Sequence, residues 1–260
     1  MSKNPIIFAG AGPGDPELIT VKGQKALARA DLILYAGSLV APAVLTWAAP
    51  ETEKVDTASL NLEEITGLMV AAHRAGKRVV RLHSGDPALF GAIQEQIAQL
   101  EKAGVPYQVI PGVTAAFAAA AALAQELTLP EVTQTVILTR AAGRTPVPDA
   151  EAIFRLAQHR ATMAIYLSIH LLDQVLADLI QAYGPEAPVV VAYRVSWPDQ
   201  IILRGTLADM GEQVRQAGIK RQALIIVSPA LAAQEDSARS KLYDATFSHG
   251  FRSGDSGSEA

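Results

Sequence analysis

Three short loops rich in glycine and proline contain the residues best suited to bind a ligand. They are GAGPGDP at residues 10–16, HSGDP at 83–87 and PGVT at 111–114. Each loop follows a short apolar run that predicts a strand, and open α/β sheets bind ligands beyond the carboxyl ends of their strands. Taken alone, each loop is best explained as an ordinary turn between a strand and a helix. Together they predict a pocket in which a ligand lies close to exposed backbone.

The first loop does not have the glycine spacing of a dinucleotide site. Counted from Gly10, the third glycine of the G-x-G-x-x-G pattern falls on Asp15, whose carboxylate would repel a pyrophosphate. Pro13 also lacks the N–H group that a phosphate cradle needs. The chain contains no G-x-x-x-x-G-K-[ST] pattern. A nicotinamide oxidoreductase is therefore disfavoured, and a nucleoside triphosphatase lacks its signature.

Composition narrows the choice of partners. The 260 residues include no cysteine, which excludes disulfides, thiolate nucleophiles and thiolate metal ligands, and we nominate no metal site. A net charge of -4 disfavours a broad nucleic-acid surface. No run reaches the ~18 apolar residues of a membrane span, and the N-terminal residues do not form a signal-peptide pattern. We expect a cytoplasmic protein with a small-molecule ligand and no nucleic-acid or membrane partner.

Apolar runs and helical periodicity predict an α/β fold. In the first half, strands are expected at 6–9, 32–35, 79–83 and 107–110. Helices between them, such as 61–75, make the sheet mostly parallel. The alanine-rich run 114–124 predicts a closely packed helix without a solvated face.

The second half predicts another αβ lobe. Its strands are expected at 133–139, 162–167, 189–193, 201–205 and 224–227, and its helices at 151–159 and 171–183. The short connection through SWPD at 196–199 predicts a hairpin, so this sheet should be mixed. The expected domains are an N-terminal lobe at 1–127, a C-terminal lobe at 128–232 and a polar, flexible tail at 233–260, with the active site in the cleft between the lobes.

The loops carry a resemblance to a known family. GAGPGDPELIT at 10–20, HSGDP at 83–87 and PGVTAAFAAAA at 111–121 resemble the signature segments of the tetrapyrrole methylases. The resemblance covers residues 5–231. Members of this family methylate ring carbons of uroporphyrinogen and precorrins with S-adenosylmethionine, and the family also contains protein and RNA methyltransferases. The resemblance implies S-adenosylmethionine as cofactor, S-adenosylhomocysteine as product, and a homodimer.

The resemblance also implies a set of cofactor contacts. The matching positions are Pro13, Ser84, Gly85, Asp86, Leu89, Thr114, Ala115, Leu167, Val195 and Ala223. Leu167 and Val195 replace the methionine and glycine of some relatives. Asp86 is expected either to bind polar groups of the cofactor or to order its loop.

Further segments resemble one branch of the family. They are LTRAAGRTPVPDAE at 138–151, SWPDQ at 196–200 and SKLYDATFSHGFR at 240–252. This branch methylates C-11 of precorrin-4, giving precorrin-5 in cobalamin biosynthesis. Cobalt-precorrin-4 and other ring positions of a precorrin or uroporphyrinogen are alternatives. An RNA methyltransferase or a nicotinamide oxidoreductase is a more remote one.

A tetrapyrrole carries several carboxylates, which cationic side chains would bind. Arg140 and Arg144 are the first candidates for substrate binding, although a solvated surface pair explains them equally well. Arg194 and Arg81 are weaker candidates, because each could form a structural ion pair. Trp197 and Tyr193 could stack on the macrocycle, but packing is the more common role.

No catalytic residue is assigned from the sequence. His83, Arg140 and Arg144 are weak candidates, and a histidine at a strand end is more often structural. Gly37 occupies a position where some relatives have aspartate, so that position supplies no general base.

Overall fold

A computed structural model describes residues 4–232 and 246–253. The chain divides into two compact units. The first unit contains the residues up to Ala122 together with Arg194–Ile201, and the second contains Leu123–Tyr193 and the residues from Ile202 onward. A short segment from the second half of the sequence therefore belongs to the first unit.

The first unit is built on a five-stranded parallel sheet with the order β3-β2-β4-β1-β5. Its strands are β1 (Ile6–Gly10), β2 (Leu32–Tyr35), β3 (Glu53–Asp56), β4 (Val79–His83) and β5 (Tyr107–Ile110). Its helices are α1 (Val21–Ala28), α2 (Leu62–Arg74) and α3 (Ile93–Lys102), and α4 (Ala115–Leu123) runs to the boundary with the second unit. The predicted parallel sheet is confirmed.

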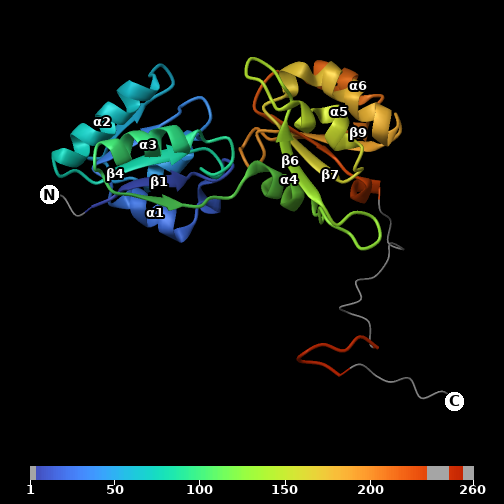
Figure 1. The fold of residues 1–260 in the computed structure, drawn as a ribbon, viewed down its shortest axis with the longest axis horizontal. Coiled ribbons are helices and arrows are strands. Elements are labelled where there is room, and N and C mark those ends of the chain that lie inside the picture. The colour runs from blue at the N-terminus through green and yellow to red at the C-terminus, as the bar shows by residue number, and fades with distance from the viewer. Residues whose placement is uncertain (1–3, 233–245, 254–260) are drawn as a thin grey trace. The chain divides into compact units, whose positions relative to one another are not determined.

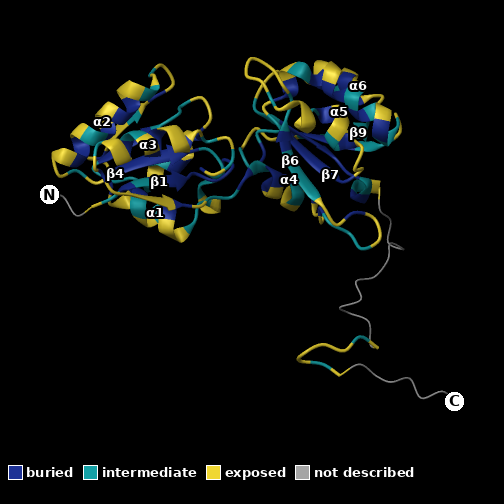
Figure 2. Cartoon of the chain, viewed as in Figure 1, coloured by how far each residue is buried: buried dark blue, intermediate teal, exposed yellow. Residues whose placement is uncertain are grey.

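Helices cover both faces of the first sheet (Figure 1). Met69 of α2 and Leu100 of α3 pack with Phe8 on one face. On the other face, Leu27 of α1 packs with Ile33 of β2. Figure 2 shows buried central strands, β1 and β4, and helices that carry both buried and exposed residues. The central strands are therefore rigid supports for the loops that follow them.

The second unit contains a five-stranded mixed sheet with the order β6-β7-β10-β8-β9. Its strands are β6 (Val136–Arg140), β7 (Thr162–Tyr166), β8 (Pro188–Tyr193), β9 (Ile201–Thr206) and β10 (Ala223–Val227). Its helices are α5 (Ile153–Ala157), α6 (Leu172–Tyr183) and α7 (Met210–Gln216). Strands β6 and β7 are parallel, whereas β10 is antiparallel to β7 and β8. The predicted mixed sheet is confirmed, and β8 and β9 are neighbours as expected.

Short 3-10 helices complete the described fold. They are η1 (Pro16–Leu18), η2 (Pro42–Trp47), η3 (Asp149–Glu151), η4 (Ile169–Leu171) and η5 (Pro229–Ala232).

One expectation needs correction. The helix predicted at 114–124 has an exposed side, because Phe117 is 55% exposed and Ala121 and Ala122, about one helical turn later, are exposed as well. Within the predicted tail, residues 246–253 form a turn closed by backbone hydrogen bonds between His249 and Arg252. The predicted flexibility of 233–245 and 254–260 concerns residues outside the described part of the chain.

Candidate active site

The three glycine loops meet at the carboxyl edge of the first sheet. Strand β1 lies between β4 and β5, so the loops that follow these strands are neighbours. Gly12 and Gly85 exchange backbone hydrogen bonds, with N–O distances of 3.2 and 2.8 Å. The Gly112 N–H donates to Asp86 Oδ2 at 2.8 Å and joins the third loop to the second. These bonds hold the three loops as one assembly.

Glycine is required at this junction because the backbones are in direct contact. A Cβ atom placed on Gly10 would lie 2.5 Å from Gly112 Cα and 2.6 Å from Gly85 O. A Cβ on Gly112 would collide with the same carbonyl of Gly85. Three loops from distant parts of the sequence can approach this closely only without side chains at these positions.

Seven of the predicted cofactor positions lie in or beside this assembly. They are Pro13, Ser84, Gly85, Asp86, Leu89, Thr114 and Ala115. The carboxylate of Asp86 accepts hydrogen bonds from the backbone of Ala88 at 2.7 Å and of Gly112 at 2.8 Å. Of its two expected roles, ordering the loop is the one visible in these contacts.

Both tryptophans of the chain donate to carbonyl groups of the first loop. Trp197 Nε1 donates to Pro13 O at 2.8 Å, and Trp47 Nε1 donates to Pro16 O at 3.0 Å. The backbone N–H of Asp15 donates to Ser196 Oγ at 3.0 Å. The sequence indicated packing for Trp197, but neither tryptophan could be assigned a partner from sequence spacing.

Arg194 and Val195 lie in the segment that joins the first unit. The guanidinium carbon of Arg194 lies 4.9 Å from the centroid of the Trp197 ring. The Nη1 atom of Arg194 lies 2.6 Å from Asp199 Oδ2. Val195 is buried. The guanidinium of Arg194 is thus already engaged by two neighbours in its own segment.

Leu167 directly follows β7 and Ala223 begins β10, so both lie at the same end of these two neighbouring strands. Ile225 pairs with Ile165 across β10 and β7, and continuing this antiparallel register sets Ala223 opposite Leu167. Leu167 adopts a left-handed φ of 55° and is 56% exposed. The next residue, Ser168, is buried and joins the ends of β6 and β7, since it accepts from Ala141 N at 2.8 Å and donates to Tyr166 O at 2.6 Å. The turn therefore directs Leu167 outward.

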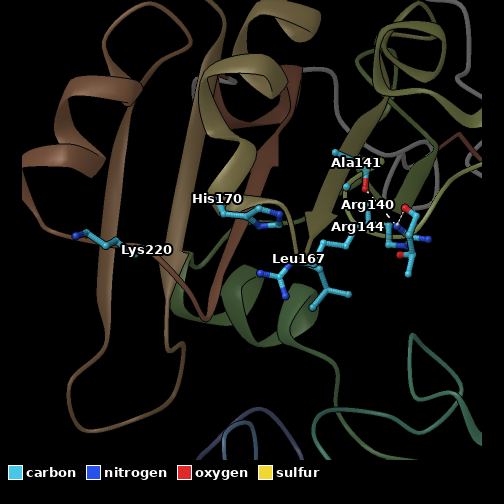
Figure 3. A pocket seen from close by; sticks show the side chains of 8 residues that line it. Arg140, Ala141, Arg144, Leu167, His170 and Lys220 are labelled. Atoms are coloured by element: carbon cyan, nitrogen blue, oxygen red, sulfur yellow. Dashed lines mark hydrogen bonds between the residues drawn. The ribbon is translucent and has the colours of Figure 1, made fainter.

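This end of the two strands lies beside a pocket of about 460 Å³. Its lining includes four basic side chains and Leu167 (Figure 3), and no aspartate or glutamate. The basic residues are Arg140, Arg144, His170 and Lys220. The structure thus brings the two predicted arginines into one pocket and adds His170 and Lys220, which were not predicted.

Arg140 is bound mainly by its own loop. Its NH1 donates to Ala141 O at 3.3 Å and Thr145 O at 3.2 Å, and its NH2 donates to Pro146 O at 2.8 Å. These bonds hold the proline-bounded loop in place. Arg144, by contrast, is exposed at the pocket.

His83 and Arg81 lie in the core of the first unit, on the central strand β4. Arg81 donates to Gln96 Oε1 at 3.1 Å and Thr57 Oγ1 at 3.0 Å and is 6% exposed. These contacts favour a structural role for Arg81 over substrate binding. Burial, together with the charge of Arg81, lowers the pKa of His83 to about 3, so its imidazole is neutral and a poor proton acceptor near pH 7. These surroundings favour the structural role of His83.

The buried His83 should make stability depend on pH. The unfolded chain protonates this histidine below its ordinary pKa of about 6.5, whereas the folded protein does not. Acidification therefore favours the unfolded chain, by about 1.4 kcal/mol for each pH unit below pH 6.5 until the folded pKa of about 3 is reached. Between about pH 7.5 and about pH 5, we expect the wild type to lose about 2 kcal/mol more unfolding free energy than His83→Gln. Urea unfolding measures this difference.

The control for this measurement is His159→Gln, which removes an exposed histidine. This variant should lose stability on acidification as the wild type does. An equal pH dependence for wild type and His83→Gln would show that His83 titrates normally in the folded protein.

A carboxylate from a distant part of the sequence lies beside Gly37. The Asp56 side chain, at the end of β3, accepts from Gly37 N at 2.9 Å and from Ala58 N at 2.9 Å. These two N–H groups lower the pKa of Asp56, so it is ionised at neutral pH. A Cβ on Gly37 would collide with this carboxylate. Strand β3 was not predicted because EKVD is largely charged, and Asp56 was missed with it.

The described residues contain neither a helix suited to cross a membrane nor a cluster of metal ligands. In residues 4–232 and 246–253, no helix has the length and apolar character needed to cross a membrane. Over the same ranges, His, Asp and Glu side chains do not converge in groups of three that could hold a metal ion.

Comparison with known sequences agrees with the loop pattern. Residues 5–211 match the family model of the Tetrapyrrole (Corrin/Porphyrin) Methylases. A cobalt-precorrin-4 C(11)-methyltransferase of Methanocaldococcus jannaschii is 52% identical over 248 residues, covering 95% of each chain. A precorrin-4 C(11)-methyltransferase of Pseudomonas aeruginosa is 51% identical over 250 residues, covering 96% of this chain and 99% of the relative.

Solved structures give the same result. A cobalt precorrin-4 methyltransferase, described as a cobalamin biosynthetic enzyme, matches with a TM-score of 0.86 and 49% identity, covering 88% of this chain and 96% of that chain. A uroporphyrin-III C-methyl transferase from Thermus thermophilus, complexed with S-adenyl homocysteine, has a TM-score of 0.73 and 28% identity, covering 88% and 99%. Fold and loops thus define an α/β methyltransferase. The chain belongs to the tetrapyrrole (corrin/porphyrin) methylases.

Proposed function

We propose that this protein transfers a methyl group from S-adenosylmethionine to C-11 of precorrin-4, giving precorrin-5 in cobalamin biosynthesis. The observation that carries the proposal is the junction of Gly10, Gly85 and Gly112, which forms a rigid backbone edge at the carboxyl ends of three parallel strands. The relatives named for this reaction match the chain over almost its whole length and support the choice of ring position.

The charge of the loops suits this methyl donor. A sulfonium cofactor carries a positive charge at sulfur and no phosphate, whereas the first two loops contain Asp15 and Asp86. Pro13 offers a carbonyl oxygen and, without an N–H, does not favour a phosphate. When bound, S-adenosylmethionine supplies an already activated methyl group. The chain then needs no nucleophile of its own.

The contribution of the protein is to hold and orient the two reactants. In-line placement can supply ~7–11 kcal/mol of the barrier to a bimolecular transfer. Pro13, Ser84, Gly85, Asp86, Leu89, Thr114, Ala115, Leu167, Val195 and Ala223 are proposed to contact the cofactor. The two proposed lobes are residues 1–127 and 128–232. Arg140, Arg144 and Arg194 are proposed to bind or position the substrate, Arg140 by holding its loop.

The test is single-turnover transfer with methyl-labelled S-adenosylmethionine and precorrin-4, followed by mass spectrometry and NMR. We expect one labelled methyl group, at C-11. Label at another ring carbon would contradict the proposed position and keep the substrate class. Binding of S-adenosylhomocysteine without any transfer to a tetrapyrrole would contradict the proposed substrate class.

Cobalt-precorrin-4 is the second candidate substrate. The relatives with 52% and 51% identity are named for the cobalt-containing and the cobalt-free substrate respectively, so both branches are close to this chain. Parallel measurements of kcat/KM with the two substrates decide between them. The substrate that is methylated with the higher kcat/KM is the preferred one.

We further propose that the enzyme acts in the cytoplasm as a homodimer and without nucleic acid. Exposed apolar side chains of the first unit, including Val109 at 38% and Phe117 at 55%, support association with a second copy. Light scattering during size-exclusion chromatography tests this, and a monomer at micromolar concentration would contradict it.

A further inference from the structure

The basic pocket of the second unit differs from an ordinary charged surface. The chain as a whole has 26 acidic and 22 Lys or Arg residues, so acidic groups are in excess. The titratable side chains that line the pocket are nevertheless all basic. Surface lysines and arginines commonly lie beside carboxylates, whereas an uncompensated group of cations attracts an anion.

Three of these side chains have their donors available. Arg144, His170 and Lys220 are exposed, and none has a hydrogen bond or ion pair to another described residue. Arg140 differs, because its Nη1 and Nη2 atoms donate to three backbone carbonyl groups of its own loop. Its role is to shape the loop that carries Arg144.

Separate elements bring these basic side chains to one place. His170 lies in η4, directly after the turn at Leu167, and Lys220 precedes β10, whose antiparallel register places its start at the end of β7. A Cβ on Gly143 would lie 3.5 Å from His170 Nε2, so the imidazole faces the loop of Arg144. In Figure 3, His170 lies between Lys220 and this loop.

We infer that this pocket binds a carboxylate side chain of the tetrapyrrole through Arg144, His170 and Lys220. The assignment rests on the proposed function and deepens it, because it adds His170 and Lys220 to the substrate site. A carboxylate is the fitting anion, since cofactor and substrate both carry this group. S-adenosylmethionine has one on its methionine part, so the experiment must separate the two sources.

The test measures binding of uroporphyrin III, a stable tetrapyrrole polycarboxylate, by fluorescence, and of S-adenosylhomocysteine by calorimetry. Lys220→Ala and His170→Ala should each weaken uroporphyrin III binding by about tenfold, the scale of one charge-assisted hydrogen bond. Affinity for S-adenosylhomocysteine should stay within about twofold of the wild type. Raising the salt concentration from about 0.05 to about 0.5 M should weaken uroporphyrin III binding by the wild type more than binding by Lys220→Ala.

Matched controls are available beside the pocket residues. Arg221→Ala removes an exposed positive charge next to Lys220, and His159→Ala removes an exposed histidine; neither residue lines the pocket. Both variants should bind uroporphyrin III like the wild type. This separates the pocket from the general charge of the unit.

Several results would overturn the inference. One is unchanged affinity and salt dependence in Lys220→Ala and His170→Ala while the wild type binds uroporphyrin III. Another is lost affinity for S-adenosylhomocysteine in these variants, which would assign the pocket to the cofactor. A wild type that binds no tetrapyrrole polycarboxylate would also overturn it. The proposed function fails separately if the variants behave as expected but the wild type does not methylate C-11 of precorrin-4.

Discussion

Gly10→Ala is expected to abolish cofactor binding at cofactor concentrations that saturate the wild type, while leaving most of the fold intact. The added methyl group would lie 2.5 Å from Gly112 Cα and 2.6 Å from Gly85 O. Both neighbours are backbone atoms, so the first loop must separate from the other two. Overpacking of this kind costs ~1–3 kcal/mol of unfolding free energy, and a displacement near 1 Å can cost ~100-fold in catalysis. We expect a loss of unfolding free energy near the upper end of this range and a loss of catalysis of at least this size.

Calorimetry with S-adenosylhomocysteine and urea unfolding measure the two effects. The matched control is Gly67→Ala in the middle of α2, where an added Cβ meets nothing within 4 Å. This change should stabilise the protein by ~0.5–1 kcal/mol, because alanine favours a helix more than glycine does. Wild-type affinity for S-adenosylhomocysteine in Gly10→Ala would show that the glycine junction does not shape the cofactor site.

The loop assembly could be predicted because parallel strands place their carboxyl ends together. The apolar run at 79–83 and the strands on each side of it were recognisable from composition, so the adjacency of their loops followed. Strand β3 could not be found this way, since its sequence EKVD lies at a sheet edge and is largely charged. Asp56, which depends on β3, was therefore missed.

Other parts of the site depend on contacts that sequence spacing does not contain. Lys220 reaches the pocket because β10 runs antiparallel to β7, and the pattern of apolar residues predicts a strand without its direction. The sequence left the role of Arg81 open, because its partners Gln96 and Thr57 meet it from α3 and from the end of β3. Tertiary partners decide whether a basic residue is structural or available.

Trp197→Phe is expected to weaken cofactor binding with little loss of stability. The Trp197 indole donates to Pro13 O at 2.8 Å, and a Cβ on Gly14 would collide with its ring. Trp197 comes from the connection between β8 and β9, yet it fixes a loop 184 positions earlier in the sequence. Phenylalanine keeps much of the packing and loses the N–H donor, so we expect the KM for S-adenosylmethionine to rise by about five- to tenfold with a smaller change in kcat.

Trp47→Phe is the matched control, because it removes the other indole that binds this loop, at Pro16 O. Pro16 is not among the proposed cofactor contacts, so the KM should rise by no more than about twofold. Each variant also leaves a single tryptophan. Addition of S-adenosylhomocysteine should change the fluorescence of Trp47→Phe, in which Trp197 remains, more than that of Trp197→Phe. Equal KM values in Trp197→Phe and the wild type would mean that the Pro13 carbonyl keeps its position without the indole. In that case the backbone bonds between Gly12 and Gly85 would be sufficient to hold the loop.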